Sequence, residues 1–321
     1  MENVYSRALD VTACINIPVK LFTTYLILTK TPRHLRHDSF FILNVVFWTF
    51  AGNFLTALAH LYPTYPAHCY RIVGPLSLLV DNETVGQVMF HAIFVCVLHS
   101  ALGLFLGFVY RYVAFVHPQS ASRIKPIWAF GLCALAHVAI FALYSVVVVF
   151  STISYDDYPY KDELPSREFL FCLVPHGWRK LLKNGLFFVV ISAGLTAIVT
   201  LASLLFREIY RKAGIINQKT LRMQRRLLWN LIILTSIVVL FGGVPLVTSL
   251  LVAWFPYIPH ANTITVVCVV IIANHGTIYA IATLLLFKQY RQAFSKMLGK
   301  ATSLSFYSTT QLFVKVHVVR K

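Results

Sequence analysis

The chain has 321 residues, of which 58% are hydrophobic and only 12% are charged, and Lys and Arg outnumber Asp and Glu by 28 to 11. So apolar a composition excludes an ordinary soluble domain. A pI near 9.8 also suits nucleic-acid binding, but the basic residues lie in loops beside apolar stretches. Anionic lipid and an acidic protein partner therefore explain the charge better than nucleic acid does.

Seven stretches of the chain are long and apolar enough to cross a bilayer, which takes about 20 residues of helix. They cover residues 8–29, 39–61, 88–110, 127–150, 185–206, 227–255 and 263–287. The sequence therefore predicts an all-α membrane protein, a seven-transmembrane helix bundle that forms one domain over residues 1–300. Residues 301–321 are predicted to be a basic cytoplasmic tail.

The distribution of charge predicts the orientation. Most Lys and Arg lie in the loops after the first, third and fifth stretches and in the tail. By the positive-inside rule these segments are cytoplasmic, so the N-terminus is outside and the first stretch acts as an uncleaved anchor. Asn82 begins an Asn-Glu-Thr triplet in a predicted outer loop, so it is a candidate glycosylation site.

Two of the six cysteines, Cys69 and Cys172, lie in loops, and both loops are predicted to be extracellular. An oxidising compartment favours a disulfide between them over two free thiols. The cysteine spacing is not that of a metal site, and no cofactor motif is visible, so we expect neither a metal nor a cofactor.

Polar residues at helical spacing mark one face of two stretches. They are Thr49, Asn53, Thr56 and His60 in the second stretch, and Ser192, Thr196 and Thr200 in the fifth. We expect both faces to point into the bundle, because lipid offers no hydrogen-bond partner. The alternative is that the hydroxyls bond to the carbonyl four residues earlier in their own helix.

Four residues are candidates for a ligand pocket: Lys20, His60, His91 and Thr248. Lys20 lies deep in the first stretch, where a cation is costly and needs a partner. That partner is either a carbonyl freed by the nearby Pro18 or a ligand carboxylate. The two histidines lie towards the outer ends of their stretches, where a purely structural role is an equal alternative.

Two features of the last part of the chain predict movement and anchoring. Pro245 interrupts the sixth stretch just after two glycines, so it is a candidate hinge. Beyond the seventh stretch, apolar residues alternate with basic ones at helical spacing, which predicts a short amphipathic helix on the inner leaflet. No catalytic motif and no mid-span acid is present, so the sequence does not indicate an enzyme.

Several short motifs occur in a characteristic order along the chain. They are Phe41–Trp48 in the second stretch, Tyr110-Arg111-Tyr112 at the end of the third, Lys219-Thr220 with Met223-Gln224 before the sixth, and His275-Gly276 with Lys288-Gln289-Tyr290-Arg291 in and after the seventh. In these the chain resembles the nematode seven-transmembrane chemoreceptors, in the Srh/Sri branch of the Str superfamily of G-protein-coupled receptors. Two departures stand out: Val109 and Tyr110 replace the family's usual acidic and amide residues before Arg111, and Gln289 replaces its proline.

The resemblance implies a plasma-membrane receptor of sensory neurons that binds a small molecule in the outer half of the bundle and activates a heterotrimeric G protein. The residues expected to meet the G protein are Arg111, Tyr112, Lys219, Arg222, Arg225 and Arg226. Because no acid precedes Arg111 in its helix, we expect altered basal control or altered coupling. Two alternatives remain at this point: a membrane channel or transporter, and a receptor-like protein that couples weakly.

Overall fold

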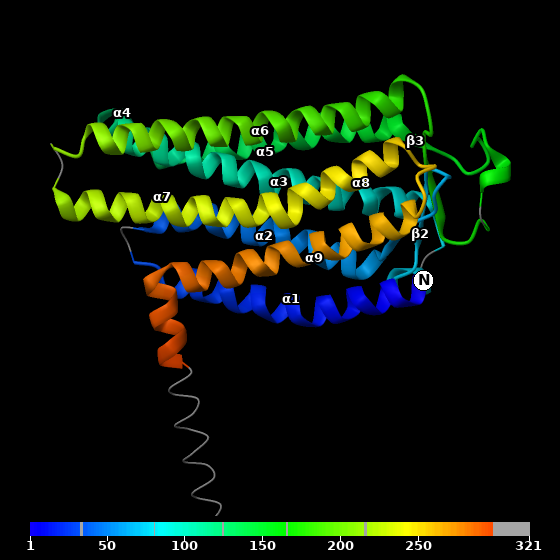
Figure 1. Ribbon diagram of the computed structural model, residues 1–321, viewed down its shortest axis with the longest axis horizontal. Coiled ribbons are helices and arrows are strands. Elements are labelled where there is room, and N and C mark those ends of the chain that lie inside the picture. The colour runs from blue at the N-terminus through cyan, green and yellow to red at the C-terminus, as the bar shows by residue number, and fades with distance from the viewer. Residues whose placement is uncertain (33–34, 80, 124, 165, 215–216, 298–321) are drawn as a thin grey trace, which may run out of the picture.

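The computed structural model describes residues 1–297 except 33–34, 80, 124, 165 and 215–216. Within these residues, seven spans are long and apolar enough to cross a membrane, which confirms the predicted bundle (Figure 1). Six are single helices, and the remaining one consists of α7 and α8. Their bounds are α1 (Glu2–Lys30), α2 (Arg36–Ala59), α3 (Glu83–Val116), α5 (Pro126–Ser151), α6 (Trp178–Arg211), α7 (Gln218–Val238), α8 (Val244–Trp254) and α9 (Ala261–Leu286).

Most of these helices begin earlier or end later than the apolar stretches that predicted them. The third stretch was predicted over 88–110, for example, whereas α3 runs from Glu83 to Val116. Hydropathy marks only the part of a helix that meets lipid, and polar turns continue the same helix beyond it. Asn82 caps α3, since its side-chain oxygen accepts a hydrogen bond from the Thr84 backbone N–H at 2.8 Å.

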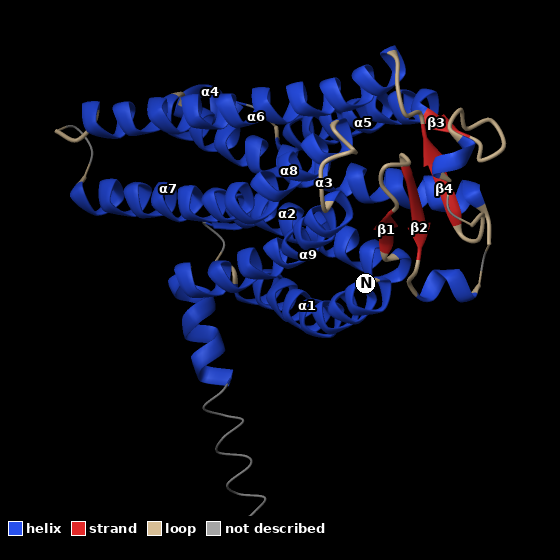
Figure 2. Cartoon of the chain, turned by 45° about the vertical axis from the view of Figure 1, so that its right-hand side comes forward, coloured by secondary structure: helices blue, strands red, loops and turns tan. Residues whose placement is uncertain are grey.

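A four-stranded antiparallel sheet covers one end of the bundle (Figure 2). Its order is β1-β2-β4-β3, with β1 (Leu61–Pro63), β2 (Cys69–Ile72), β4 (Leu170–Leu173) and β3 (Thr152–Ile153). The N-terminus lies at the same end, which we call the sheet end. These strands have two to four residues each, too few for alternating hydropathy to predict them.

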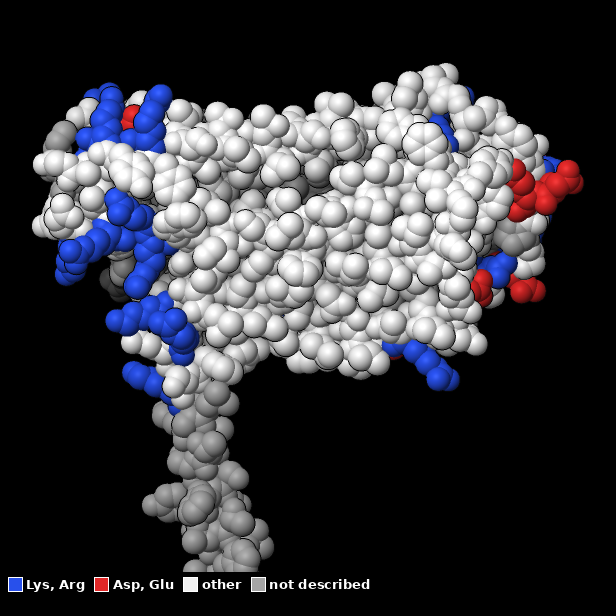
Figure 3. All heavy atoms as spheres, in the orientation of Figure 1, with Lys and Arg blue, Asp and Glu red and all other residues white. Residues whose placement is uncertain are grey.

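The opposite end of the bundle carries most of the positive charge. It holds the short helix α4 (Pro118–Arg123), the end of α6 and the beginning of α7, and we call it the basic end. Figure 3 shows Lys and Arg side chains gathered there and the acidic side chains gathered mainly at the sheet end. This asymmetry is the one from which the sequence predicted orientation.

Helix α3 crosses the centre of the bundle and packs against α2, α5 and α6, while α1 packs against α2 and α9. Gly103 permits the close approach of α3 to α2. A Cβ at that position would lie 3.1 Å from Asn44 Nδ2 and 3.2 Å from a methyl group of Val45. The largest hydrophobic cluster lies towards the basic end and joins all these helices except α5.

The predicted amphipathic helix is present over residues 288–297, at an angle to the bundle (Figure 1). Tyr290 is fully buried, and its hydroxyl lies 2.8 Å from Thr31 Oγ1 and 2.9 Å from Ser39 Oγ. These contacts tie the helix to the ends of α1 and α2, so the tyrosine of the Lys-Gln-Tyr-Arg motif has a structural role. The predicted tail over 301–321 lies outside the described residues.

Candidate ligand cavity and coupling face

A cavity of about 780 Å³ lies inside the bundle, within the range typical of small-molecule sites. It is lined mainly by residues of α2, α3, α6, α8, α9 and the turn between α7 and α8, with a few residues from α1, α5 and α7. Among the described residues that line it there is no Asp, Glu, Lys or Arg, and aliphatic and aromatic side chains dominate. The cavity therefore suits an uncharged, largely apolar molecule.

The sheet closes the cavity at the sheet end. Leu61 of β1 and Tyr70 of β2 line the cavity directly, and Phe90 of α3 lies beside them. The rings of Tyr70 and Phe171 stack at 5.7 Å between centroids. Gly86 allows this arrangement, because a Cβ there would lie 2.3 Å from Cδ1 of Phe171.

The predicted disulfide joins the two central strands. Cys69 and Cys172 are opposite each other in the β2–β4 register, and their sulfurs are bonded at 2.04 Å. Both residues are fully buried. The bond therefore holds the segment after α2 to the segment before α6, across the cavity's closed end.

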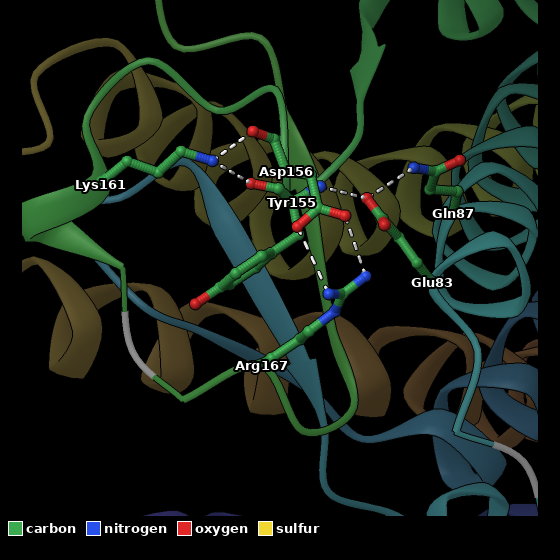
Figure 4. A network of polar contacts seen from close by, with 6 residues as sticks. All are labelled: Glu83, Gln87, Tyr155, Asp156, Lys161 and Arg167. Carbon is green, nitrogen blue, oxygen red and sulfur yellow. Dashed lines mark hydrogen bonds and ion pairs between the residues drawn. The ribbon is translucent and has the colours of Figure 1, made fainter.

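Polar contacts order the long segment between β3 and β4 (Figure 4). Glu83, at the start of α3, accepts hydrogen bonds from the Tyr155 backbone N–H at 3.0 Å and from Gln87 at 3.4 Å. Arg167 forms a two-pronged ion pair with Asp156, at 3.3 and 3.1 Å. Lys161 (in the turn Lys161–Glu163) donates to the Tyr155 carbonyl at 3.1 Å. These contacts hold the parts of the segment together and attach the segment to α3.

Among the described groups at this end, the pKa of His68 is strongly lowered. His68 is buried, and burial together with Lys180 and Lys183 lowers its pKa from 6.5 to about 3. Lys180 Nζ lies 2.9 Å from His68 Nε2, so the ammonium donates a hydrogen bond to the neutral imidazole. The His68 backbone N–H donates to the Tyr158 hydroxyl at 3.0 Å. Protonation of His68 would therefore oppose the folded arrangement here.

The polar face of α2 points inward, as predicted, and forms part of the cavity wall. Thr49, Asn53 and Thr56 all line the cavity, and Asn53 Nδ2 donates to the Ala273 carbonyl at 2.6 Å. The prediction for the fifth stretch is right for Ser192, which borders the cavity, and wrong for the other two residues. Thr196 and Thr200 lie on the outer surface, and each bonds to the carbonyl four residues earlier, at 2.9 and 2.8 Å.

Lys20 does not line the cavity. It is fully buried, and its ammonium donates to the Thr49 carbonyl at 2.8 Å. Gly276 makes room for it, because a Cβ there would lie 2.7 Å from Lys20 Nζ. The partner in the structure is therefore a carbonyl of α2 rather than one freed by Pro18, and the glycine of the His-Gly motif is explained by close packing.

The two candidate histidines also lie outside the cavity. His60 Nδ1 is 2.9 Å from Ser6 Oγ and its Nε2 is 3.6 Å from Asp10, so it ties the end of α2 to α1. His91 Nε2 is 3.0 Å from Ser145 Oγ and faces α5. Of the four pocket candidates, Thr248 alone is in the cavity wall.

The turn between α7 and α8 is irregular at the predicted hinge. Residues Val239–Gly243 form a π-helical turn, and Pro245 follows in the first turn of α8. Such turns occur often at functional sites, where they interrupt the regular hydrogen-bond ladder. Gly242 packs closely on the His275 ring, and Gly242 and His275 both line the cavity.

At the basic end, Arg111 has an acidic partner that its own helix does not supply. Its Nη2 lies 3.0 Å from Asp38 Oδ1, in the first turn of α2, and the Arg111 side chain is only 12% exposed. The expectation that Arg111 lacks a local acidic partner is thus corrected. The sequence did contain a signal, since few acids lie in the predicted cytoplasmic segments, and Asp38 is one of them.

The other predicted coupling residues are arranged differently from Arg111. Lys219, Arg222, Arg225 and Arg226 are all exposed on α7, and Arg225 lies 5.3 Å from the centroid of the Tyr210 ring. Tyr112 is half-buried and packs against the large hydrophobic cluster. Lys212, which the sequence did not single out, donates to the Phe115 carbonyl at 3.0 Å and so joins α6 to α3.

Within the described residues, no group of three or more His, Cys, Asp or Glu is arranged to hold a metal ion. A profile of the family described as serpentine type 7TM GPCR chemoreceptor Srh matches residues 1–300. The chain belongs to this family. The match confirms the Srh part of the predicted resemblance, and the family and fold are those of a receptor rather than an enzyme.

The fold of this Srh chain is also found in a solved structure. The crystal structure of squid rhodopsin superposes with a TM-score of 0.62 over 94% of this chain and 87% of that one, at 15% sequence identity. At so low an identity the similarity shows the fold alone. No curated protein matches the chain.

Proposed function

We propose that this Srh-family protein is a G-protein-coupled chemoreceptor of the plasma membrane, with its sheet end outside and its basic end in the cytoplasm. The observation that carries the proposal is that Gly242, Gly243 and Val244 line the cavity and also join α7 to α8. A ligand in the cavity therefore touches the irregular turn from which α7 runs to the basic end. A ligand that prefers one geometry of this turn shifts the position of α7.

The basic end offers a positively charged surface to which a Gα subunit can bind. Four exposed cations on α7, Lys219, Arg222, Arg225 and Arg226, give electrostatic complementarity to an acidic partner. Arg111 is covered and paired with Asp38, so we infer that this is the resting arrangement. Movement of α7 away from α3 would uncover Arg111 for contact with Gα. The expression site that fits a chemoreceptor is a sensory neuron.

The proposal is tested by a ligand screen with the receptor in cells that carry a calcium reporter, followed by nucleotide exchange on purified Gα. An active ligand should accelerate exchange by wild-type receptor, and Arg111→Ala should abolish that acceleration while leaving ligand binding intact. A ligand-evoked current without G protein would support a channel instead. Unchanged exchange by Arg111→Ala would remove the role given to that residue.

The proposed orientation has its own test, at Asn82. The side chain is exposed and caps α3 through the Thr84 backbone N–H, so Thr84→Ala removes the glycosylation triplet and keeps the cap. With the sheet end outside, the wild-type protein should carry a glycan that a peptide N-glycosidase removes, and Thr84→Ala should carry none. A wild-type mobility unaffected by the glycosidase would contradict the orientation.

A further inference from the structure

The cavity opens sideways, between α6 and α8, while its sheet end is closed. Phe188, Leu195 and Val244 line the cavity and are also 44%, 39% and 55% exposed on the outer surface of the bundle. All three belong to α6 or to the start of α8. Among the described helices, α6 packs against α3, α5 and α7 but scarcely touches α8. Figure 3 shows this face hollowed between α6 and the α7–α8 span.

At the sheet end, by contrast, the lining residues are covered. Tyr5 and Phe90 are buried, Leu61 and Tyr70 are not exposed, and the disulfide-linked strands lie over them. In a membrane, the sideways opening faces hydrocarbon, which concentrates apolar solutes and excludes ions. A molecule that reaches the cavity by this route has already partitioned into the bilayer.

The cavity wall nevertheless offers hydrogen-bonding groups to a ligand. Asn53 lines the cavity and donates from its Nδ2 to the Ala273 carbonyl. The Ser100 hydroxyl, which borders the cavity from α3, is buried and unpaired. A buried polar group without a partner carries a free-energy penalty that a suitable ligand group removes.

We propose that the cavity binds an uncharged, membrane-partitioning molecule with one hydroxyl or similar polar group, which enters between α6 and α8 and meets Asn53 and Ser100. This rests on the proposed function only in placing the ligand in this cavity. A lipid acyl chain fits the opening equally well in shape, but it brings no polar group to these residues.

The chain contains its own reporter for this route. Cys96 is a free, buried cysteine that borders the cavity, and Cys14 is a free cysteine exposed on α1. Purified receptor in lipid nanodiscs is treated with neutral N-ethylmaleimide or with a sulfonated maleimide, and modification is followed at each cysteine by peptide mass spectrometry. The thiol adds across the maleimide double bond, and its proton passes to the adjacent carbon, so no oxidant is needed.

The neutral reagent should modify Cys96, whereas the sulfonated reagent should leave it unmodified. Gly194 lies on α6 in the cavity wall, and a Cβ there has no atom within 4 Å. The ring of Gly194→Phe should therefore obstruct the opening. It should slow Cys96 modification several-fold and leave Cys14 unaffected. Gly185→Phe is the matched control, because Gly185 is on the same helix, equally unobstructed and outside the cavity wall.

Protection of Cys96 tests the ligand class in the same assay. We expect 1-octanol to protect Cys96, and octanoate and octane to protect it poorly. Ser100→Ala should raise the 1-octanol concentration that half-protects Cys96 by about fivefold, because it removes one hydrogen bond. Equal protection by octane would identify an acyl-chain site and overturn the polar part of the proposal.

Two results would overturn the route: Cys96 that stays unmodified while Cys14 reacts with the neutral reagent, or equal modification of Cys96 by both reagents. A Gly194→Phe rate equal to that of Gly185→Phe would do the same. The assay contains no G protein, so these failures are distinct from failure of nucleotide exchange. Melting temperatures of the variants, measured without ligand, identify any that do not fold.

Discussion

The sheet end and the basic end of this receptor are held together by different forces. At the sheet end a disulfide, a sheet and buried aromatic rings link α2, α3 and the segment before α6. At the basic end the large hydrophobic cluster packs the helices together, and the links between them are polar: the Arg111–Asp38 ion pair joins α2 and α3, and Lys212 joins α6 and α3. A disulfide cannot exchange partners without bond cleavage, whereas an ion pair can exchange one partner for another. The contrast predicts a fixed sheet end and a basic end that opens.

The largest expected effect comes from removal of the disulfide. Its cysteines are 103 residues apart, and a cross-link over that length contributes about 4 kcal/mol. We expect Cys69→Ser with Cys172→Ser to lower the melting temperature sharply. Cys14→Ser, at an exposed free cysteine, is the control and should change little. If both variants melt alike, the sheet end is not the fixed end.

A methyl group at Gly86 should also loosen the sheet end. Gly86→Ala would drive a Cβ into the buried Phe171 ring, at a cost of about 1–3 kcal/mol in unfolding free energy. Gly185→Ala meets no atom within 4 Å and should be neutral or slightly stabilising, because alanine favours helix. Thermal unfolding of the two variants measures the difference. Equal melting temperatures would mean that the Phe171 ring can move aside at little cost in free energy.

Acid should weaken the sheet end through His68. Its folded pKa of about 3 lies below the unfolded value of 6.5, so the unfolded chain binds the extra proton between these values. The stabilisation is therefore complete above pH 6.5 and decreases as pH falls, by about 2 kcal/mol at pH 5. His68→Gln keeps an acceptor for Lys180 and should flatten the stability profile between pH 7 and pH 5. An unchanged profile would exclude His68 as its cause.

A substitution at the basic end should change the activity of the receptor more than its stability. Asp38→Asn removes the charge that holds Arg111, which we expect to cost about 1 kcal/mol in unfolding free energy and to raise ligand-independent nucleotide exchange on Gα. Asp10→Asn is a control at the sheet end, where the carboxylate is 58% exposed beside His60. An Asp38→Asn receptor with wild-type basal exchange would show that the pair does not restrain activity.

The sequence predicted the parts of this structure that depend on composition over many residues. Apolar length predicted the seven spans, loop position predicted the Cys69–Cys172 pair, and Pro245 lies beside an irregular turn. It did not predict the short strands or the Asp38 partner of Arg111, because both depend on which segments meet in space. Three pocket candidates, Lys20, His60 and His91, lie outside the cavity wall for the same reason: each contacts a neighbouring helix, and the sequence does not show which helices are neighbours.

The most direct test of the contrast between the two ends is amide hydrogen exchange in wild-type and Asp38→Asn receptor, followed by mass spectrometry. If release of Arg111 opens the basic end alone, exchange should accelerate towards the end of α3 and in the first turns of α7. The amides of β2 and β4 should exchange at the wild-type rate. Equal acceleration at both ends, or none at the basic end, would contradict the account.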